Sequence, residues 1–108
     1  MKIYEWESAG GKNTIETYFN AKTITEKMQY YKTKNAIEED GLTAFENLNT
    51  RQLYGKLWEI KVSQNRIMYV IADKESVYFL HACKKQKGKA EKFNLDKAIK
   101  RAKQSNLL

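Results

Sequence analysis

Residues 57–92, LWEIKVSQNRIMYVIADKESVYFLHACKKQKGKAEK, hold the side chains best suited to chemistry on a phosphodiester. A strand of RNA can be cleaved without a metal under three conditions. Its 2′-hydroxyl is deprotonated and aimed at the adjacent phosphate, cations hold the extra negative charge, and the leaving 5′-oxygen is protonated. Arg66 is permanently charged and can bind a phosphate through two donors. Lys61 and Lys85 supply further cations for the crowded phosphate.

Two other side chains of this stretch are candidate acid–base groups. His81 titrates near neutrality, and Glu59 is a second possible base. Each has a simpler alternative: a lone His is often structural, and Glu59 with Lys61 could form a surface ion pair worth about 0–1 kcal/mol. Cys83 is better explained as a small buried side chain than as a nucleophile. The candidate catalytic residues are therefore Lys61, Arg66, His81, Lys85 and Glu59.

The positive charge of the chain is concentrated in its C-terminal half, with a run of lysines around Lys85. Residues 1–50 contain 6 Lys and 8 Asp or Glu, a net charge of −2, whereas residues 51–108 contain 14 Lys or Arg and 5 Asp or Glu, a net charge of +9. This asymmetry indicates a polyanionic partner, either nucleic acid or an acidic protein, with solubility alone as the alternative. The candidate RNA-binding residues are Lys56, Lys84, Lys87, Lys89 and Lys92.

Size and composition exclude several classes of protein. With 108 residues and 12.7 kDa the chain is expected to form a single domain, 1–108. No apolar run approaches the roughly 20 residues of a membrane span, and the first residues lack the apolar core of a secretory signal, so we expect a cytoplasmic protein. One Cys cannot form an internal disulfide, and one Cys with one His argues against structural zinc. No nucleotide-binding glycine motif is present, and no cofactor is expected.

Most of the candidate catalytic residues lie on three predicted strands, 57–63, 66–72 and 76–83, which are joined by short polar segments at 64–65 and 73–75. A first strand is predicted at 2–7. Asn13 and Thr23 begin predicted helices at 14–21 and at about 24–39, and Gly41 ends the second. The apolar stripe of that second helix is Ile24, Met28 and Tyr31.

The remaining segments complete the expected fold. Residues 42–55 are predicted to be an ordered connection with one helical turn. Asn94 is predicted to cap a helix at 95–105. Its apolar face is Leu95, Ala98, Ile99 and Ala102, and its exposed cations are Lys97, Lys100, Arg101 and Lys103. The expected fold class is α+β, with two N-terminal helices packed on a mostly antiparallel sheet of about four strands and a C-terminal helix.

Strand parity predicts which side chains share a face. If Gln64 and Asn65 form a two-residue loop, Ser63 faces Arg66. Pairing of Ala72 with Val77 in the second turn then gives one face that carries Glu59, Lys61, Arg66, Met68, Val70, Phe79, His81 and Cys83. The opposite face is the predicted core under the two helices, with Trp58, Ile60, Val62, Ile67, Tyr69, Ile71, Tyr78 and Leu80. A slip of one residue in either turn would break this grouping. Because unpaired charge is poorly tolerated under a covering layer, the charged face is expected to be open to solvent or an anion.

The block LWEIKVSQNRIMYVIADKESVYFLHACKKQKGKAEKFNLDKAIKRA resembles the RelE/ParE superfamily of bacterial toxins, most closely its phage-derived HigB-like branch. The matching features are LWEIK followed closely by Arg66 and Tyr69, an apolar strand ending in LHACKK, a basic linker, and a closing helix that bears AIKRA. The resemblance is best over about residues 53–103. Before them only the order of strand and helices agrees.

The resemblance implies a RelE-like fold and the toxin of a type II toxin–antitoxin system. Such a toxin is a small endoribonuclease that enters the ribosomal A site, cuts mRNA there without a metal, and so inhibits translation. A cognate HigA-like antitoxin with a helix-turn-helix domain holds it inactive. By position, Lys61 and Arg66 match basic residues of the sheet, Lys85 matches the basic position after the last strand, and His81 matches the family's LH position. Two residues depart from the pattern: Glu59 replaces a basic residue of some relatives, and Phe93 lies near a Tyr implicated in catalysis in others.

Two other functions stay open at this point. The chain could be a noncatalytic inhibitor of DNA gyrase, as in the ParE branch, or a plain nucleic-acid-binding module. Early loss of DNA supercoiling control while translation continues would indicate a gyrase inhibitor. Steep salt dependence of binding without cleavage would indicate a nucleic-acid-binding module.

Overall fold

A computed structural model describes all residues, 1–108, and contains one sheet of five strands. Along the chain the elements are β1 (Lys2–Glu5), α1 (Thr14–Asn20), α2 (Ile24–Asp40), the 3-10 helix η1 (Gly41–Asn47), β2 (Thr50–Tyr54), β3 (Leu57–Val62), β4 (Asn65–Asp73), β5 (Ser76–Lys84) and α3 (Lys89–Gln104). The strands lie in the order β1-β5-β4-β3-β2, and only the β1–β5 pair is parallel. The α+β class and the mostly antiparallel sheet are confirmed, and the structure has one strand more than expected.

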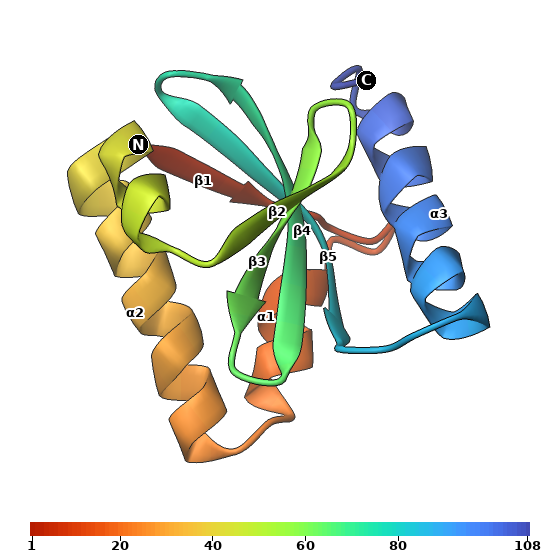
Figure 1. Cartoon of the computed structure of the whole chain (residues 1–108), viewed down its shortest axis with the longest axis horizontal. Helices are drawn as coiled ribbons and strands as arrows, with labels where there is room; N and C mark the ends of the chain where they lie inside the picture. The colour runs from red at the N-terminus through yellow and green to blue at the C-terminus, as the bar shows by residue number, and fades with distance from the viewer.

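The sheet lies between two helical layers, with α1 and α2 on one face and α3 on the other (Figure 1). Each face has its own apolar core. The core under α1 and α2 includes Ile15, Phe19, Tyr30, Ile37, Ile60, Ile67, Val77 and Phe79. The core under α3 is smaller and consists of Leu57, Met68, Val70, Leu80, Ala98 and Ala102. None of the helices is both long enough and apolar enough to cross a membrane.

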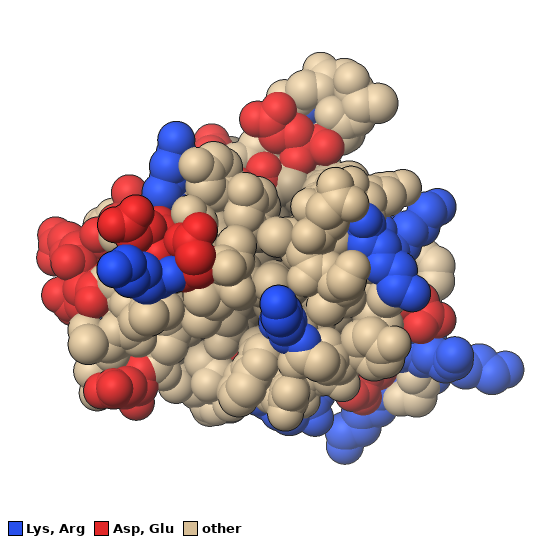
Figure 2. Space-filling model, turned by 90° about the horizontal axis from the view of Figure 1, so that it is seen from above, with Lys and Arg blue, Asp and Glu red and all other residues tan.

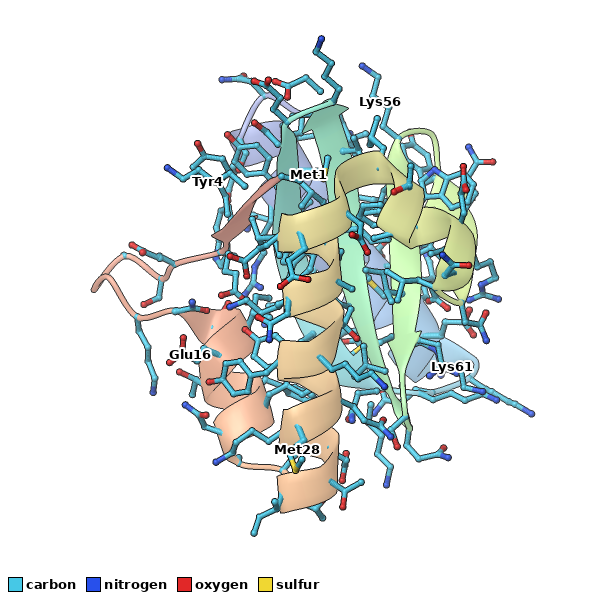
Figure 3. All side chains as sticks on the ribbon, turned by 90° about the vertical axis from the view of Figure 1, so that its left-hand side faces the viewer. Met1, Tyr4, Glu16, Met28, Lys56 and Lys61 are labelled. Carbon is cyan, nitrogen blue, oxygen red and sulfur yellow. The ribbon has the colours of Figure 1, made fainter.

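The caps of α1 and α2 are the predicted ones, but the predicted apolar stripe of α2 is wrong. The side chain of Thr23 accepts a hydrogen bond from the Glu26 amide, and Gly41 ends the helix at φ 64°. Ile24 and Met28 are 77% and 66% exposed, and Tyr31 is also exposed. Figure 3 shows Met28 on the outer side of α2. The helix instead buries Tyr30 and Ile37.

Tyr30 explains why α2 is turned this way. Its ring stacks on Phe19 with centroids 4.3 Å apart, and its hydroxyl donates to the carboxylate of Glu5. Lys34, one turn further along, forms an ion pair with the same carboxylate at 2.9 Å. The helix therefore buries a satisfied polar network beside its apolar contacts, and a pattern of apolar spacing alone does not detect such a network.

Residues 42–55 contain the expected helical turn, η1, together with β2, an edge strand that was not predicted. Arg51, Gln52 and Tyr54 of this strand are exposed, so its sequence shows little apolar alternation. Pairing with β3 orders the strand, with Thr50 opposite Ile60 and Arg51 opposite Glu59. The register shifts between Gln52 and Tyr54, where β2 turns into β3.

The turn between β3 and β4 consists of Ser63 and Gln64, one residue earlier than predicted. Ser63 has φ 58°, Val62 pairs with Asn65, and Lys61 pairs with Arg66. Relative to the expected pairing of Ser63 with Arg66, this register differs by two residues. Because strand side chains alternate with a period of two, each residue stays on its predicted face.

The expected grouping of β5 is only partly correct, because Val77 pairs with Ile71 rather than with Ala72, and the register with β4 then shifts again between Met68 and Tyr69. Met68 pairs with His81, whereas Tyr69 pairs with Phe79. His81 and Cys83 therefore share the face of Met68 and Arg66 as predicted, but Phe79 belongs to the core under α1 and α2. Leu80 and Tyr78 pack on the α3 side rather than in that core. A β-bulge of this kind has no clear mark in the sequence.

Two expectations about burial are also corrected. Trp58 is 37% exposed at the margin of the sheet, so it is not an interior core residue. Arg101 of α3 is not freely exposed: it lies over the ring of Trp6 at 5.2 Å and donates from Nη1 to the carbonyl of Leu80 at 2.8 Å.

Helix α3 begins at Lys89, after Gly88 at φ 66°, so Asn94 is not its cap but a buried residue inside it. The predicted apolar face is confirmed, with Ala98 and Ala102 fully buried and with Leu95 and Ile99 packed against the same core.

Candidate functional site

A cleft of about 360 Å³ lies between the sheet, the segment after β5 and the first turns of α3, and we call it the basic cleft. Six cations line it: Arg51, Lys61, Arg66, Lys84, Lys85 and Lys87. Two carboxylates, Glu59 and Glu91, lie among them, and the remaining lining residues are Asn49, Thr50, Met68, Cys83, Gln86 and Asn94. Charge is also unevenly distributed over the whole molecule: Figure 2 shows acidic side chains gathered on the side of α2 and basic ones on the side of α3.

The cleft exists because α3 covers only part of its face of the sheet. Its buried alanines, Ala98 and Ala102, pack on Leu80, Met68 and Val70, next to β5. The ends of β2, β3 and β4 that carry charge are left uncovered by the helix. The expectation of an open charged face is thus correct for this part of the sheet, and α3 covers the rest.

Arg66 is the most firmly held cation of the basic cleft. Its Nη1 donates to the carbonyl oxygens of Asn65 at 2.9 Å and Ser63 at 3.4 Å, and its Nε lies 3.5 Å from Oε2 of Glu59. Only 11% of its side chain is exposed. No hydrogen bond or ion pair within the chain uses its Nη2, so a rigid guanidinium keeps donors for an external anion.

Lys61 and Lys85 line the same cleft as Arg66. Lys61 is directly opposite Arg66 in the β3–β4 register and is exposed. The backbone amide of Lys85 donates to the carbonyl of Gln64 at 2.8 Å, which ties the segment after β5 to the β3–β4 turn. Neither ammonium group has an ion-pair partner in the chain. Both are therefore free to contact phosphate.

Glu59 does not pair with Lys61, which was the simpler alternative for this residue. Its carboxylate is buried between two guanidinium groups, 3.4 Å from Nε of Arg51 and 3.5 Å from Nε of Arg66. Arg51 also reaches Glu91 of α3 at 3.4 Å. Arg51 is thus a site residue that the sequence interpretation missed, because β2 was not recognised and its pairing with Glu59 could not be read.

His81 does not line the basic cleft but lies behind it, against α3. Its Nε2 is 2.6 Å from Oδ1 of Asn94, and its Nδ1 is 3.4 Å from Nη1 of Arg101. The amide nitrogen of Asn94 donates to Gln86 and to the carbonyl of Ala90, so its oxygen faces the histidine as an acceptor. Nε2 must then carry the proton, and Nδ1 accepts from Arg101.

This arrangement favours the neutral imidazole. Burial lowers the pKa of His81, and although the hydrogen bond to Asn94 raises it, the charges of Arg101 and Lys97 lower it further. A second proton would also place Nδ1–H against the Arg101 guanidinium. The geometry fits a residue that positions Asn94 and the neighbouring Gln86 better than one that exchanges protons with a substrate.

The lysines expected to bind RNA are divided by the structure. Lys84 and Lys87 line the basic cleft, whereas Lys89 lies on the adjoining surface beside the exposed Phe93. Lys92 lies 3.6 Å from Asp96 on the outside of α3. Lys56 is distant from all of these, and Figure 3 shows it at the opposite end of β3 from Lys61. The structure therefore brings together Glu59, Lys61, Arg66, Lys84, Lys85 and Lys87, but not His81, Lys56, Lys89 or Lys92.

Cys83 borders the basic cleft and is half-buried. Burial raises the pKa of its thiol to about 11, so little thiolate is present near neutral pH. No three side chains of His, Cys, Asp or Glu come together as a metal-binding group. The charged groups that line the cleft are guanidinium, ammonium and carboxylate groups.

A family model described as phage-derived protein Gp49-like (DUF891) matches residues 17–103, from α1 to the last turn of α3. The chain belongs to this Gp49-like family. The family contains toxin-like proteins of the RelE and HigB type, so the resemblance is confirmed at that level. The matched range includes every residue that lines the basic cleft. A search of curated proteins finds no match.

Proposed function

We propose that this Gp49-like protein is the toxin of a type II toxin–antitoxin system, of the HigB-like branch, and that it cleaves mRNA in the ribosomal A site. The observation that supports this most directly is the pairing of Lys61 with Arg66 at an open end of the sheet, where Lys85 is tied to the same turn. Three cations with donors free for a phosphate are what stabilisation of a pentavalent phosphorane requires.

In this proposal each charged group has one task. Arg66, held by two carbonyl oxygens, binds the scissile phosphate through Nη2. Lys61 and Lys85 hold the charge that develops as the 2′-oxygen attacks, and one of their ammonium groups gives a proton to the leaving 5′-oxygen. Glu59 takes the proton of the 2′-hydroxyl, because it is the carboxylate nearest Arg66. The products are a 2′,3′-cyclic phosphate and a 5′-hydroxyl, and no cofactor is needed.

The ion pairs of Glu59 give a reason for activation by substrate. A phosphate that binds Arg66 and Arg51 competes with Glu59 for both guanidinium groups. Release of the carboxylate from these ion pairs makes it available to the 2′-hydroxyl. The remaining lysines, Lys84, Lys87, Lys89, Lys92 and Lys56, add contacts to RNA or to the ribosome.

The proposed partners are the ribosome with its mRNA, in the cytoplasm, and a HigA-like antitoxin with a helix-turn-helix domain. They rest on the toxin-like family and on the basic surface beside α3. A small neighbouring gene that encodes a helix-turn-helix protein would add support.

Induction in a bacterial host, followed by mapping of mRNA 5′ ends, tests the proposal. We expect in-frame cuts with the wild type and with Lys32→Ala, a matched control on the exposed side of α2, and loss of cuts with Arg66→Ala, Lys61→Ala and Lys85→Ala. Intact messages with the wild type, or unchanged cleavage in both Arg66→Ala and Lys61→Ala, would contradict it. If DNA supercoiling control fails first while translation continues, the chain is a gyrase inhibitor. If the protein binds ribosomes with steep salt dependence and cuts nothing, it is a plain nucleic-acid-binding module.

A further inference from the structure

A second cleft, on the α2 side of the sheet, has no part in the proposed reaction. It is about 280 Å³ in volume and is lined by Phe45, Thr50, Lys56, Trp58, Tyr69 and Ile71; we call it the aromatic cleft. The ring of Phe45 stacks on that of Tyr69 with centroids 5.2 Å apart and planes at 28°. Trp58 is directly opposite Tyr69 in the β3–β4 register and is 37% exposed.

The shape and lining of the aromatic cleft restrict what it can hold. Its volume suits one flat ring system and is too small for the apolar face of a helix, which needs several side chains in a groove. Its only charged lining residue is Lys56, and no carboxylate lines it. The exposed ring of Trp58 beside the partly buried Phe45, with one cation at the rim, suits a planar group that carries a negative charge nearby, as a nucleotide does.

The aromatic cleft adjoins the basic cleft across the edge of the sheet. Thr50 lines both clefts, and β2, which contains it, is the edge strand. The next residue, Arg51, faces the basic cleft, because successive side chains of a strand point to opposite faces. One extended polynucleotide can therefore round the β2 edge and contact both clefts with different nucleotides of the same strand.

We propose that the aromatic cleft binds a nucleobase of the same RNA strand that places its scissile phosphate in the basic cleft. Lys56 contacts the phosphate of the nucleotide whose base is bound. This inference rests on the proposed function for the identity of the strand. The base is held by stacking against Trp58 and by contact with Phe45 and Ile71, so the site discriminates purines from pyrimidines by area rather than by a pattern of hydrogen bonds.

The test uses the isolated full chain and nucleoside monophosphates, so it does not depend on ribosomes or on cleavage. In a ¹H–¹⁵N spectrum each of the two tryptophans, Trp6 and Trp58, gives its own indole signal. We expect AMP and GMP at millimolar concentration to shift the Trp58 indole signal more than CMP and UMP do, and to leave Trp6 unchanged. Adenosine should shift it less than AMP does, and inorganic phosphate should not shift it.

Variants distinguish the contribution of the base from that of the phosphate, and binding in the aromatic cleft from binding in the basic cleft. In these variants the signals of the backbone amides of Thr50 and Ile71 report binding. Trp58→Ala should weaken AMP binding at least about fivefold, whereas Trp58→Phe should retain most of it. Lys56→Ala should weaken AMP but not adenosine. Arg66→Ala should leave the aromatic cleft intact. No shift with any nucleotide, or shifts lost in Arg66→Ala, would overturn the inference, as would a Trp58 shift caused by N-acetyl-leucinamide but not by AMP. Since mRNA cleavage is not the readout, these outcomes are distinct from failure of the proposed ribonuclease.

Discussion

The imidazole of His81 is joined to Asn94 by a hydrogen bond of 2.6 Å, which links the last strand of the sheet to the middle of α3. Both residues are more than 90% buried. The amide of Asn94 continues to Gln86 at 2.8 Å, in the segment that carries Lys85 and Lys87. The network therefore sets where the basic segment lies relative to the sheet.

His81→Gln tests whether this histidine is structural. The folded protein has a lowered His81 pKa, so as pH falls below the ordinary value of 6.5 the unfolded chain binds a proton first. As the pH falls from 6.5 to the lower pKa of folded His81, the wild type should lose the stability that the neutral imidazole contributes. The glutamine variant should not show this loss, because glutamine does not titrate. At pH 7 we expect the variant to unfold about 1 kcal/mol more easily. The stability difference measured by urea unfolding should shrink as the pH falls to 5.

The activity of the same variant separates the two roles. A positioning residue predicts that the acidic and basic limbs of the pH–rate profile stay where they are in His81→Gln, with a lower rate throughout. Disappearance of one limb would show that His81 exchanges protons with the substrate.

Tyr18 holds the turn that presents Arg66, and its hydroxyl donates to Oδ1 of the buried Asn65 at 2.6 Å. Tyr18→Phe leaves that acceptor without this donor, so the free energy of unfolding should fall by about 1–3 kcal/mol. Tyr31→Phe makes the same chemical change at an exposed tyrosine without a hydrogen bond, and it should leave stability nearly unchanged. Equal effects of the two substitutions on urea unfolding would contradict the role of Tyr18.

The sequence correctly predicts which side chains of β3 and β4 share the charged face, because an error of two residues in the pairing register leaves every side chain on the same face. The β3–β4 turn was placed one residue late, yet Lys61 and Arg66 remained on one face. The same reasoning fails on β5, since Val77 pairs with Ile71 rather than with Ala72, which puts Phe79 on the other face, and a bulge at Leu80 then returns His81 to the charged face. Alternation contains no signal for an extra residue in one strand.

Other site features depend on contacts between segments far apart in the chain. Asn94 has the residue type of a helix cap, but Gly88 begins the helix, and the partner that explains Asn94, His81, is 13 residues away. The ion pair of Arg51 with Glu59 is not predictable from the local sequence, because the edge strand that contains Arg51 is mostly exposed and is ordered by pairing with β3. Local patterns can predict which cations share a face, whereas the ion pairs among them become visible only in the structure.

Substitutions of Arg51 and Glu91 should change the affinity for RNA in opposite directions. Glu91 shares the guanidinium of Arg51 with Glu59, so Glu91→Gln should strengthen binding of a single-stranded RNA by removing a competitor and a repulsive charge. Arg51→Ala should weaken binding and reduce the slope of log affinity against log salt by about 0.7. Fluorescence anisotropy of a labelled oligonucleotide measures both, with Lys32→Ala as the control. An unchanged slope in Arg51→Ala would place the RNA elsewhere.

Glu59→Gln should separate binding from cleavage. The amide keeps the size of the side chain but removes the charge that competes with phosphate for Arg66 and Arg51. We expect RNA affinity equal to or higher than that of the wild type, and a cleavage rate at least about a hundredfold lower, since general base catalysis is typically worth 10²–10⁴. A variant that binds RNA as well as the wild type and cleaves at the same rate would exclude Glu59 as the base.

The most direct test of the cleft as a ribonuclease site uses the wild-type protein and programmed bacterial ribosomes with two messages that differ by one atom. In one message the nucleotide at the mapped cut has a 2′-hydroxyl, and in the other it is 2′-deoxy. We expect the first message to be cut to a 2′,3′-cyclic phosphate and a 5′-hydroxyl, and the second not to be cut at that position. Cleavage of the deoxy message at the same place and rate, or a product with a 5′-phosphate, would contradict it, because attack would then come from water rather than from the 2′-oxygen.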